Sequence, residues 1–218
     1  MKLSFKLIPC ADEALSSWLI RISRKHYLNS KEFCDFHEMT KFWKEAMDID
    51  SDLSQLNEVF EYNVRGINNV RTIINDFSWE KGRSQWLIEP NKKGVSLQNS
   101  FTQICPGCLS KMAYIQLKWK FNLFFGCSAC GKKLIKRCPN CNRYISPLKA
   151  DIHVRLSEDF HPFWNCLQCG FDLRSAIPDK LTNIEIEEIK KLETAYMETP
   201  SNIRYLKFKQ FGTIEGLT

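Results

Sequence analysis

The stretch that decides the fold runs from residue 105 to residue 169 and contains four cysteine pairs: CPGC at 105–108, CSAC at 127–130, CPNC at 138–141 and CLQC at 166–169. Two residues between paired cysteines let both thiolates turn inward onto one ion, and two such pairs complete the tetrahedral four-sulfur shell that zinc prefers. The pattern therefore predicts two structural zinc ions held by eight ligands, Cys105, Cys108, Cys127, Cys130, Cys138, Cys141, Cys166 and Cys169.

The four pairs can close in two ways, either in sequence (first with second, third with fourth) or as a cross-brace (first with third, second with fourth). The gaps between successive pairs are 18, 7 and 24 residues. Cross-braced and tandem modules of the RING and LIM kind have only a few residues at the middle gap, so the spacing favours two zinc ribbons in series. Four thiolates leave no open position on the metal, which argues against a catalytic zinc and against an enzyme. His153 and His161 are interpreted as surface or packing residues, and Cys10 and Cys34 as core residues.

The composition is that of a folded protein kept in a reducing compartment. The chain has 218 residues, 44% of them hydrophobic and 26% charged, with ten cysteines and a formal net charge of +6. The first residues lack the pattern of a signal peptide, and no stretch is long and apolar enough to span a membrane. We therefore expect a cytoplasmic protein whose cysteines bind metal or pack in the core.

The first hundred residues contain no cysteine pair and show helical periodicity. Leu15, Trp18, Leu19 and Ile22 form one apolar stripe after Asp12, which we expect to cap the helix, with Arg21 and Arg24 on the solvent side. Ser30 is expected to cap a second helix, and two further stripes lie within residues 53–60 and 70–77. These segments predict a small helical bundle that resembles a helix-turn-helix.

The expected fold is mainly α with small β zinc ribbons. It divides into a helical N-terminal part (1–100), a first ribbon (101–137), a second ribbon (138–175) and a C-terminal helical tail (176–218). Residues 114–119 and 122–125 are interpreted as short β-like runs, and the apolar spacing at 181–192 as a helix.

Positive charge is concentrated beside the cysteines. Residues 101–150 contain nine Lys and Arg and no Asp or Glu. One interpretation is a nucleic-acid surface in which cations alternate with Tyr114, Trp119 and Tyr144; the other is neutralisation of the zinc centres, each of which carries −2. The candidate phosphate-binding residues are Lys132, Lys133, Lys136, Arg137 and Arg143. With both centres loaded, the net charge of the chain falls to about +2.

Several motifs together resemble the TniQ family: PCADEALSSWLIRIS near the start, CPGCL, Trp119, CSACGKKL, CPNC followed by Ile145 and Pro147, and WNCLQCGFDL. The resemblance covers roughly residues 5–175. Cys130 departs from the family pattern, which commonly has histidine at this position, but cysteine is an equally good zinc ligand.

The resemblance implies a non-catalytic adaptor in bacterial DNA transposition. Such proteins mark the insertion site, on an attachment sequence in DNA or on a guide-RNA CRISPR effector, and pass it to an AAA+ ATPase that recruits the transposase. The resemblance also implies an N-terminal helix-turn-helix and, in some members, a head-to-tail homodimer. The alternative hypothesis is a stand-alone zinc-dependent regulator that binds one DNA sequence tightly.

Overall fold

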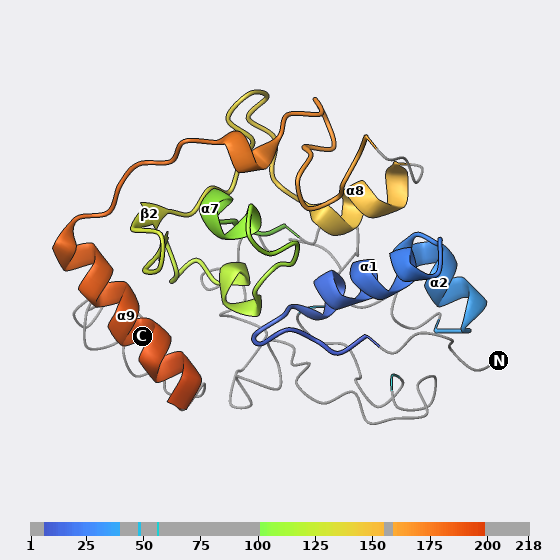
Figure 1. The fold of residues 1–218 in the computed structure, drawn as a ribbon, viewed down its shortest axis with the longest axis horizontal. Helices are drawn as coiled ribbons and strands as arrows, with labels where there is room; N and C mark the ends of the chain where they lie inside the picture. Colours follow the sequence, from blue (N-terminus) through green and yellow to red (C-terminus); the bar gives the residue numbers. More distant parts are fainter. Residues whose placement is uncertain (1–6, 40–47, 49–55, 57–100, 155–158, 199–218) are drawn as a thin grey trace, which may run out of the picture.

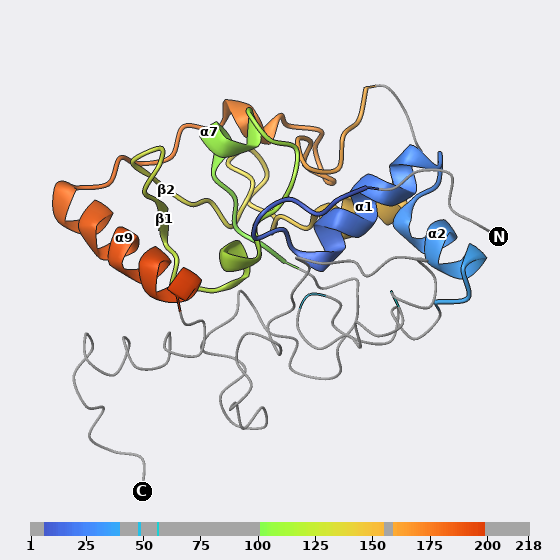
Figure 2. The same ribbon diagram turned by 60° about the horizontal axis from the view of Figure 1, so that its bottom comes forward.

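The computed structural model describes residues 7–39, 48, 56, 101–154 and 159–198, and the following account is limited to them. In chain order the elements are α1 (Leu15–Lys25), α2 (Ser30–Phe36), α7 (Pro106–Leu109), the 3₁₀-helix η3 (Leu117–Lys120), β1 (Gly126–Cys127), β2 (Lys132–Lys133), α8 (Pro147–His153), the 3₁₀-helix η4 (Leu173–Ser175) and α9 (Asn183–Glu198). Figures 1 and 2 both place α1 and α2 at one end of this part and α9 at the other, with the cysteine-bearing segments between them.

Helix α1 forms because its apolar residues recur at helical spacing and meet the core. The predicted stripe is confirmed, since Leu15, Trp18, Leu19 and Ile22 are all buried. The predicted cap is wrong: Asp12 has a φ of 56°, and the residue before the helix is Ala14, which makes no side-chain cap. The backbone N–H of Ala14 instead donates to the carbonyl of Ile115, 2.9 Å away, so contact with a distant segment sets the start of the helix.

The solvent side predicted for α1 is also wrong at both arginines. Arg21 forms an ion pair with the buried carboxylate of Glu13, and Arg24 with the buried carboxylate of Asp151 at 2.8 Å. Both arginine side chains are consequently mostly covered, with 23% and 18% exposed. The 3.6-residue period identifies the apolar face of a helix, but it does not show that partners elsewhere in the chain cover the polar face.

Helix α2 begins one residue after its cap, which is Asn29 and not the predicted Ser30. The Asn29 side chain accepts a hydrogen bond from the backbone of Glu32, and the Glu32 carboxylate accepts one from the backbone of Asn29, which is a complete capping box. Ser30 is the first helical residue and donates to Asp151 from both its N–H and its hydroxyl, at 2.7 and 2.6 Å.

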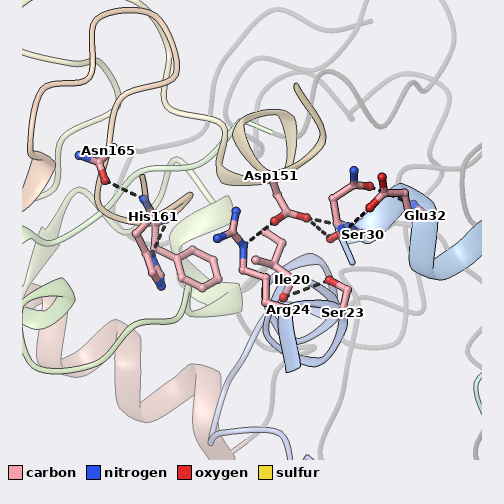
Figure 3. A network of polar contacts seen from close by, with 10 residues as sticks. Ile20, Ser23, Arg24, Ser30, Glu32, Asp151, His161 and Asn165 are labelled. Atoms are coloured by element: carbon pink, nitrogen blue, oxygen red, sulfur yellow. Dashed lines mark hydrogen bonds and ion pairs between the residues drawn. The ribbon is translucent and has the colours of Figure 1, made fainter. Parts of the chain in front are cut away.

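Asp151 in α8 therefore joins three helices. Its two oxygens accept from Arg24 in α1 and from Ser30 at the start of α2, as Figure 3 shows. A fully buried carboxylate is tolerated only when it is paired and hydrogen-bonded, and here both oxygens are. This contact connects the N-terminal helices to the segment between the third and fourth cysteine pairs.

The cysteine-rich segment contains little regular sheet. β1 and β2 pair antiparallel, with Gly126 opposite Lys133 and Cys127 opposite Lys132. The predicted β-like run at 114–119 is wrong over much of its length, because residues 117–120 form η3; the run at 122–125 lies in no strand either. The fold is thus mainly helical with one two-stranded sheet.

One core runs through the described part of the chain. Its largest fully buried side chains come from α1, from α2 and from the segments around the cysteines: Trp18, Phe33, Trp119, Phe121, Phe124 and Phe163. The helical pattern expected at 181–192 corresponds to α9. Of the helices expected at 53–60 and 70–77 the structure describes only Leu56, which is helical and buried. The remainder, and with it most of the helix-turn-helix-like bundle, lies outside the described residues. Within the described residues, no helix combines the length and the apolarity that crossing a membrane requires.

Candidate metal centres and their surroundings

The first cysteine group brings together Cys105, Cys108, Cys127 and Cys130. Cys105 immediately precedes α7 and Cys108 lies within it, whereas Cys127 ends β1 and Cys130 lies in the turn that leads to β2. The four sulfurs all lie within 4.8 Å of one another. A short helix and a β-turn therefore supply two ligands each.

The second group brings together Cys138, Cys141, Cys166 and Cys169, again within 4.8 Å. Its two pairs have the same backbone arrangement. The N–H of Cys138 donates to the carbonyl five residues ahead, and its carbonyl accepts from the N–H four residues ahead; Cys166 repeats both bonds. The first group combines the first and second cysteine pairs, and the second group combines the third and fourth. The pairing in sequence predicted from the gaps is confirmed, and the cross-brace is excluded.

The distances between sulfurs fit a metal shell. Cys108 Sγ lies 3.5 Å from Cys127 Sγ and 3.6 Å from Cys130 Sγ, and the second group has separations of 3.7 and 3.6 Å. A disulfide would require about 2.05 Å, and all these cysteines are free. A regular tetrahedron with zinc–sulfur bonds of about 2.3 Å has edges of about 3.8 Å, close to the observed values. Each group could therefore hold a metal ion, and the all-thiolate donor set suits zinc.

In the second group, hydrogen bonds favour the thiolate form of Cys169, whereas burial opposes the thiolate form of Cys166. The side chain of Asn140 and the backbone N–H of Phe171 lower the pKa of exposed Cys169 to about 6. Burial raises the pKa of Cys166 to about 12 although two backbone N–H groups donate to it. A bound dication resolves this conflict, because a coordinating thiol loses its proton outright.

Left-handed residues close three of the four cysteine turns. Gly131, Asn142 and Gly170 each follow the second cysteine of a pair and have φ values of 59°, 57° and 72°. Glycine and asparagine are the residues that tolerate this conformation best. In the sequence the asparagine of CPNCN could have been recognised by its position, which matches that of the two glycines.

Neither histidine near the second group joins it. His161 stacks on Trp164 with ring centroids 3.9 Å apart, and its Nδ1 accepts a hydrogen bond from the backbone of Phe163. The guanidinium of Arg174 covers Trp164 as well, 4.2 Å from the ring centroid. His153 is exposed at the end of α8. The packing and surface roles predicted for these residues are consistent with these positions.

Helix α9 and Leu181, just before it, pack against β1 and the CSAC turn of the first group. Ile189 and Leu181 lie against Gly126, where even a methyl group would come within 2.5 and 2.7 Å of their side chains. Glu193 accepts a hydrogen bond from Ser128, inside the CSAC turn, and pairs with Lys118 at 3.0 Å. The residues after the second cysteine group thus return to pack on the first.

The five candidate phosphate-binding residues lie along one connection. Lys132 and Lys133 form β2, Lys136 and Arg137 precede the CPNC pair, and Arg143 follows it. Lys133 is paired with exposed Asp179 at 3.6 Å, and Lys136 contacts the side chain of Asn122 at 3.0 Å. The last three are exposed. The structure thus places four of the five on the segment that joins the two cysteine groups, and Arg143 just after the first cysteine pair of the second group.

The aromatic residues that were expected to alternate with these cations offer no open ring face. Trp119 is 2% exposed and Tyr114 is 9% exposed. The Arg137 guanidinium lies 3.5 Å from the centroid of Tyr144, against which Phe101 also packs. Lys120 is buried as well, paired at 2.8 Å with Asp48. Stacking on bases is therefore not available at Trp119 or Tyr114, and at Tyr144 it would have to displace Arg137, so contact with nucleic acid here depends chiefly on charge.

Comparison with known proteins gives the family. The TniQ family profile matches residues 4–134, which is more than half of the 218 residues. The chain belongs to the TniQ family, and it is therefore a transposition-associated protein. The match includes the first cysteine group and ends before the second, so it is shorter than the stretch of 5–175 expected from the motifs. A search of curated proteins found no match.

Proposed function

We propose that this chain is a non-catalytic adaptor in DNA transposition. In this proposal it links target recognition, by a guide-RNA CRISPR effector or by an attachment sequence in DNA, to an AAA+ ATPase regulator that recruits the transposase. The family match over residues 4–134 is the observation that carries the proposal. A head-to-tail pair of copies, as in some family members, is the assembly we expect.

The donor sets of the two centres support a structural role for the metal. Four thiolates fill the tetrahedral shell of zinc, so substrate or activated water has no free position. The buried carboxylates of the described residues are also engaged: Glu13 accepts from Ser17 and Arg21, Asp48 from Ser16, and Asp151 from Ser30. These acids are held as structural partners.

The distribution of charge supports a limited contribution to nucleic-acid binding. The cations at 132–143 are better suited to bind backbone phosphates than bases, because the aromatic rings near them are covered and not open to stacking on bases. The metal-loaded chain has a net charge of only about +2, which supplies little long-range attraction to DNA. We therefore expect weak DNA binding by the protein alone and strong retention once the partner assembly is present.

The test is co-purification. The zinc-loaded full chain would be immobilised and offered the AAA+ ATPase encoded nearest to its gene, with double-stranded DNA and ATP. We expect the immobilised chain to retain the ATPase together with the DNA. Reversal of Lys132→Glu with Lys133→Glu should leave the zinc content unchanged and reduce the salt dependence of DNA retention, whereas Lys190→Glu with Lys191→Glu on the exposed side of α9 serves as the matched control.

The outcomes separate the adaptor from a stand-alone regulator. A regulator would bind one DNA sequence tightly and with steep salt dependence in the absence of any partner. Failure to retain the ATPase on DNA with ATP, together with such partner-free binding, would overturn the adaptor proposal. If the reversed lysines change nothing, they serve only to balance the charge of the centres.

A further inference from the structure

A cavity of about 320 Å³ is lined in part by residues of α1. Four of its lining residues are apolar and come from three separate segments: Leu7, Ile20, Ala113 and Phe163. Cavities of this size are large enough for one aliphatic or aromatic side chain with its neighbouring polar group. The cavity is thus suited to an apolar group that also carries a partner for the charged lining residues.

The charged lining is cationic, and most of its charge is already balanced. Arg21 donates to the carboxylate of Glu13, and the Nε of Arg24 donates to Asp151 at 2.8 Å. Lys25, in the last turn of α1, is exposed. The three cations and the two carboxylates leave one positive charge at the cavity.

Arg24 also has an unused donor. Its Nη2 is buried and meets no hydrogen-bond acceptor among the described residues. In Figure 3 the Arg24 side chain lies between Asp151 and His161, which lines the cavity. Burial, together with Arg24 and Arg174, lowers the pKa of His161 to about 4, so His161 is neutral at neutral pH. The lining thus offers guanidinium and ammonium donors around an apolar interior.

We propose that this cavity binds a short peptide segment of a protein partner, one that presents an apolar side chain next to a single carboxylate. The apolar walls match the side chain, and the single net positive charge together with the donors of Arg24 and Lys25 matches the carboxylate. A nucleic-acid backbone is a poorer match, because it presents successive phosphates and hydrophilic sugars, whereas two of the three cations here are paired with carboxylates. The inference goes beyond the adaptor role and does not depend on it.

The probe that tests this is N-acetyl-L-phenylalanine, compared with its neutral amide and with inorganic phosphate. Each would be titrated into the zinc-loaded full chain and followed by NMR at the amides of Ile20, Ala113 and Phe163. We expect N-acetyl-L-phenylalanine to bind at least about fivefold more tightly than its amide, because the amide cannot accept a charge-assisted hydrogen bond as a carboxylate does. Phosphate should not displace it.

Two variants and a control complete the test. Ala113→Phe fills the cavity and should abolish binding, and Lys25→Gln, a substitution at an exposed residue, should weaken the carboxylate about threefold while leaving the amide unchanged. Lys191→Gln, exposed on α9, is the matched control and should change neither. No binding of the carboxylate, equal binding of carboxylate and amide, or displacement by phosphate overturns the proposal. These results are read without the ATPase, so they stand apart from the outcome of the co-purification.

Discussion

The hydroxyl of Tyr196 donates a hydrogen bond to Oδ1 of Asp12 over 2.5 Å, although 184 positions separate the two residues. Asp12 lies in the turn before α1, and Tyr196 in the last turns of α9. The carbonyl and carboxylate of Asp12 also accept from the backbone of Leu117 and Lys118, at 2.6 and 3.5 Å. Asp12 thus holds together the start of α1, the segment around η3 and α9.

Replacement of Asp12 by asparagine should stabilise the protein, and more so at neutral than at acidic pH. Burial raises the pKa of Asp12 to about 6, against the attraction of Lys118 and the hydrogen bond from Tyr196. The folded state therefore holds the proton more tightly than the unfolded state, and the stability contribution of Asp12 falls as pH rises from about 4 to about 6. We expect the advantage of Asp12→Asn to be larger by about 1 kcal/mol at about pH 7.5 than at about pH 5.

Urea unfolding of both proteins at the two pH values measures this difference, and any release of metal at low pH cancels in the comparison. An advantage that stays constant with pH would show that Asp12 is not the titrating group. Tyr196→Phe is the companion variant, since it removes the hydroxyl and keeps the carboxylate buried.

Gly126→Ala should loosen α9. The added methyl would lie 2.5 Å from Ile189 Cδ1 and 2.7 Å from a methyl of Leu181, so these buried side chains, or the helix that carries Ile189, must move. Overpacking of this kind costs about 1–3 kcal/mol. Hydrogen exchange of the α9 amides should accelerate, and adding Ile189→Val, which deletes Cδ1, should recover part of the protection. Unchanged exchange in the single variant would contradict the packing seen here.

Cys138→Ser should lower the metal content from two ions to one per chain. It removes one of the four thiols of the second group and leaves the first group intact. Structural zinc contributes on the order of 10 kcal/mol in small domains, so the segment around the second group should unfold locally. Native mass spectrometry gives the metal count, and Cys10→Ser, outside both groups, should keep both ions. Two retained ions in Cys138→Ser would refute the assignment of ligands.

Lys120→Gln should destabilise the fold far more than Lys133→Gln. Lys120 is 6% exposed and pairs with Asp48, which is 2% exposed, so the substitution leaves a buried carboxylate without its cation. Loss of one partner of a buried pair costs about 3–5 kcal/mol. The pair of Lys133 with Asp179 is 45% and 82% exposed, and its loss should cost less than about 1 kcal/mol. Denaturant unfolding of the two variants decides, and equal losses would contradict the difference in burial.

The cysteine pairing could be predicted from the sequence because it depends on local spacing. Two residues between ligands and a gap of 7 between the middle pairs already constrain which sulfurs meet. The same holds for α1, whose apolar positions recur every three or four residues. Both signals lie within short stretches, so no information about the rest of the chain is needed.

The sequence-based predictions were wrong where a residue far along the chain determines the local exposure or conformation. Arg24 looks solvent-facing on a helical wheel, but its partner Asp151 lies 127 positions further along. Trp119 looks like part of a stretch of β-forming residues, yet the chain turns into η3 there, next to the backbone bonds with Asp12. The cover of the first centre by α9 depends on the absence of a side chain at Gly126, which no periodicity reveals.

The return of α9 onto the first cysteine group has a consequence for synthesis of the chain. A ribosome releases Asp12, Lys118 and the first four thiols long before Tyr196, so the first group waits uncovered while the remaining residues are made. Contacts of such long sequence separation form slowly, because the loop must close before they stabilise anything. Early metal capture would protect these nascent thiols from oxidation until α9 emerges to cover them.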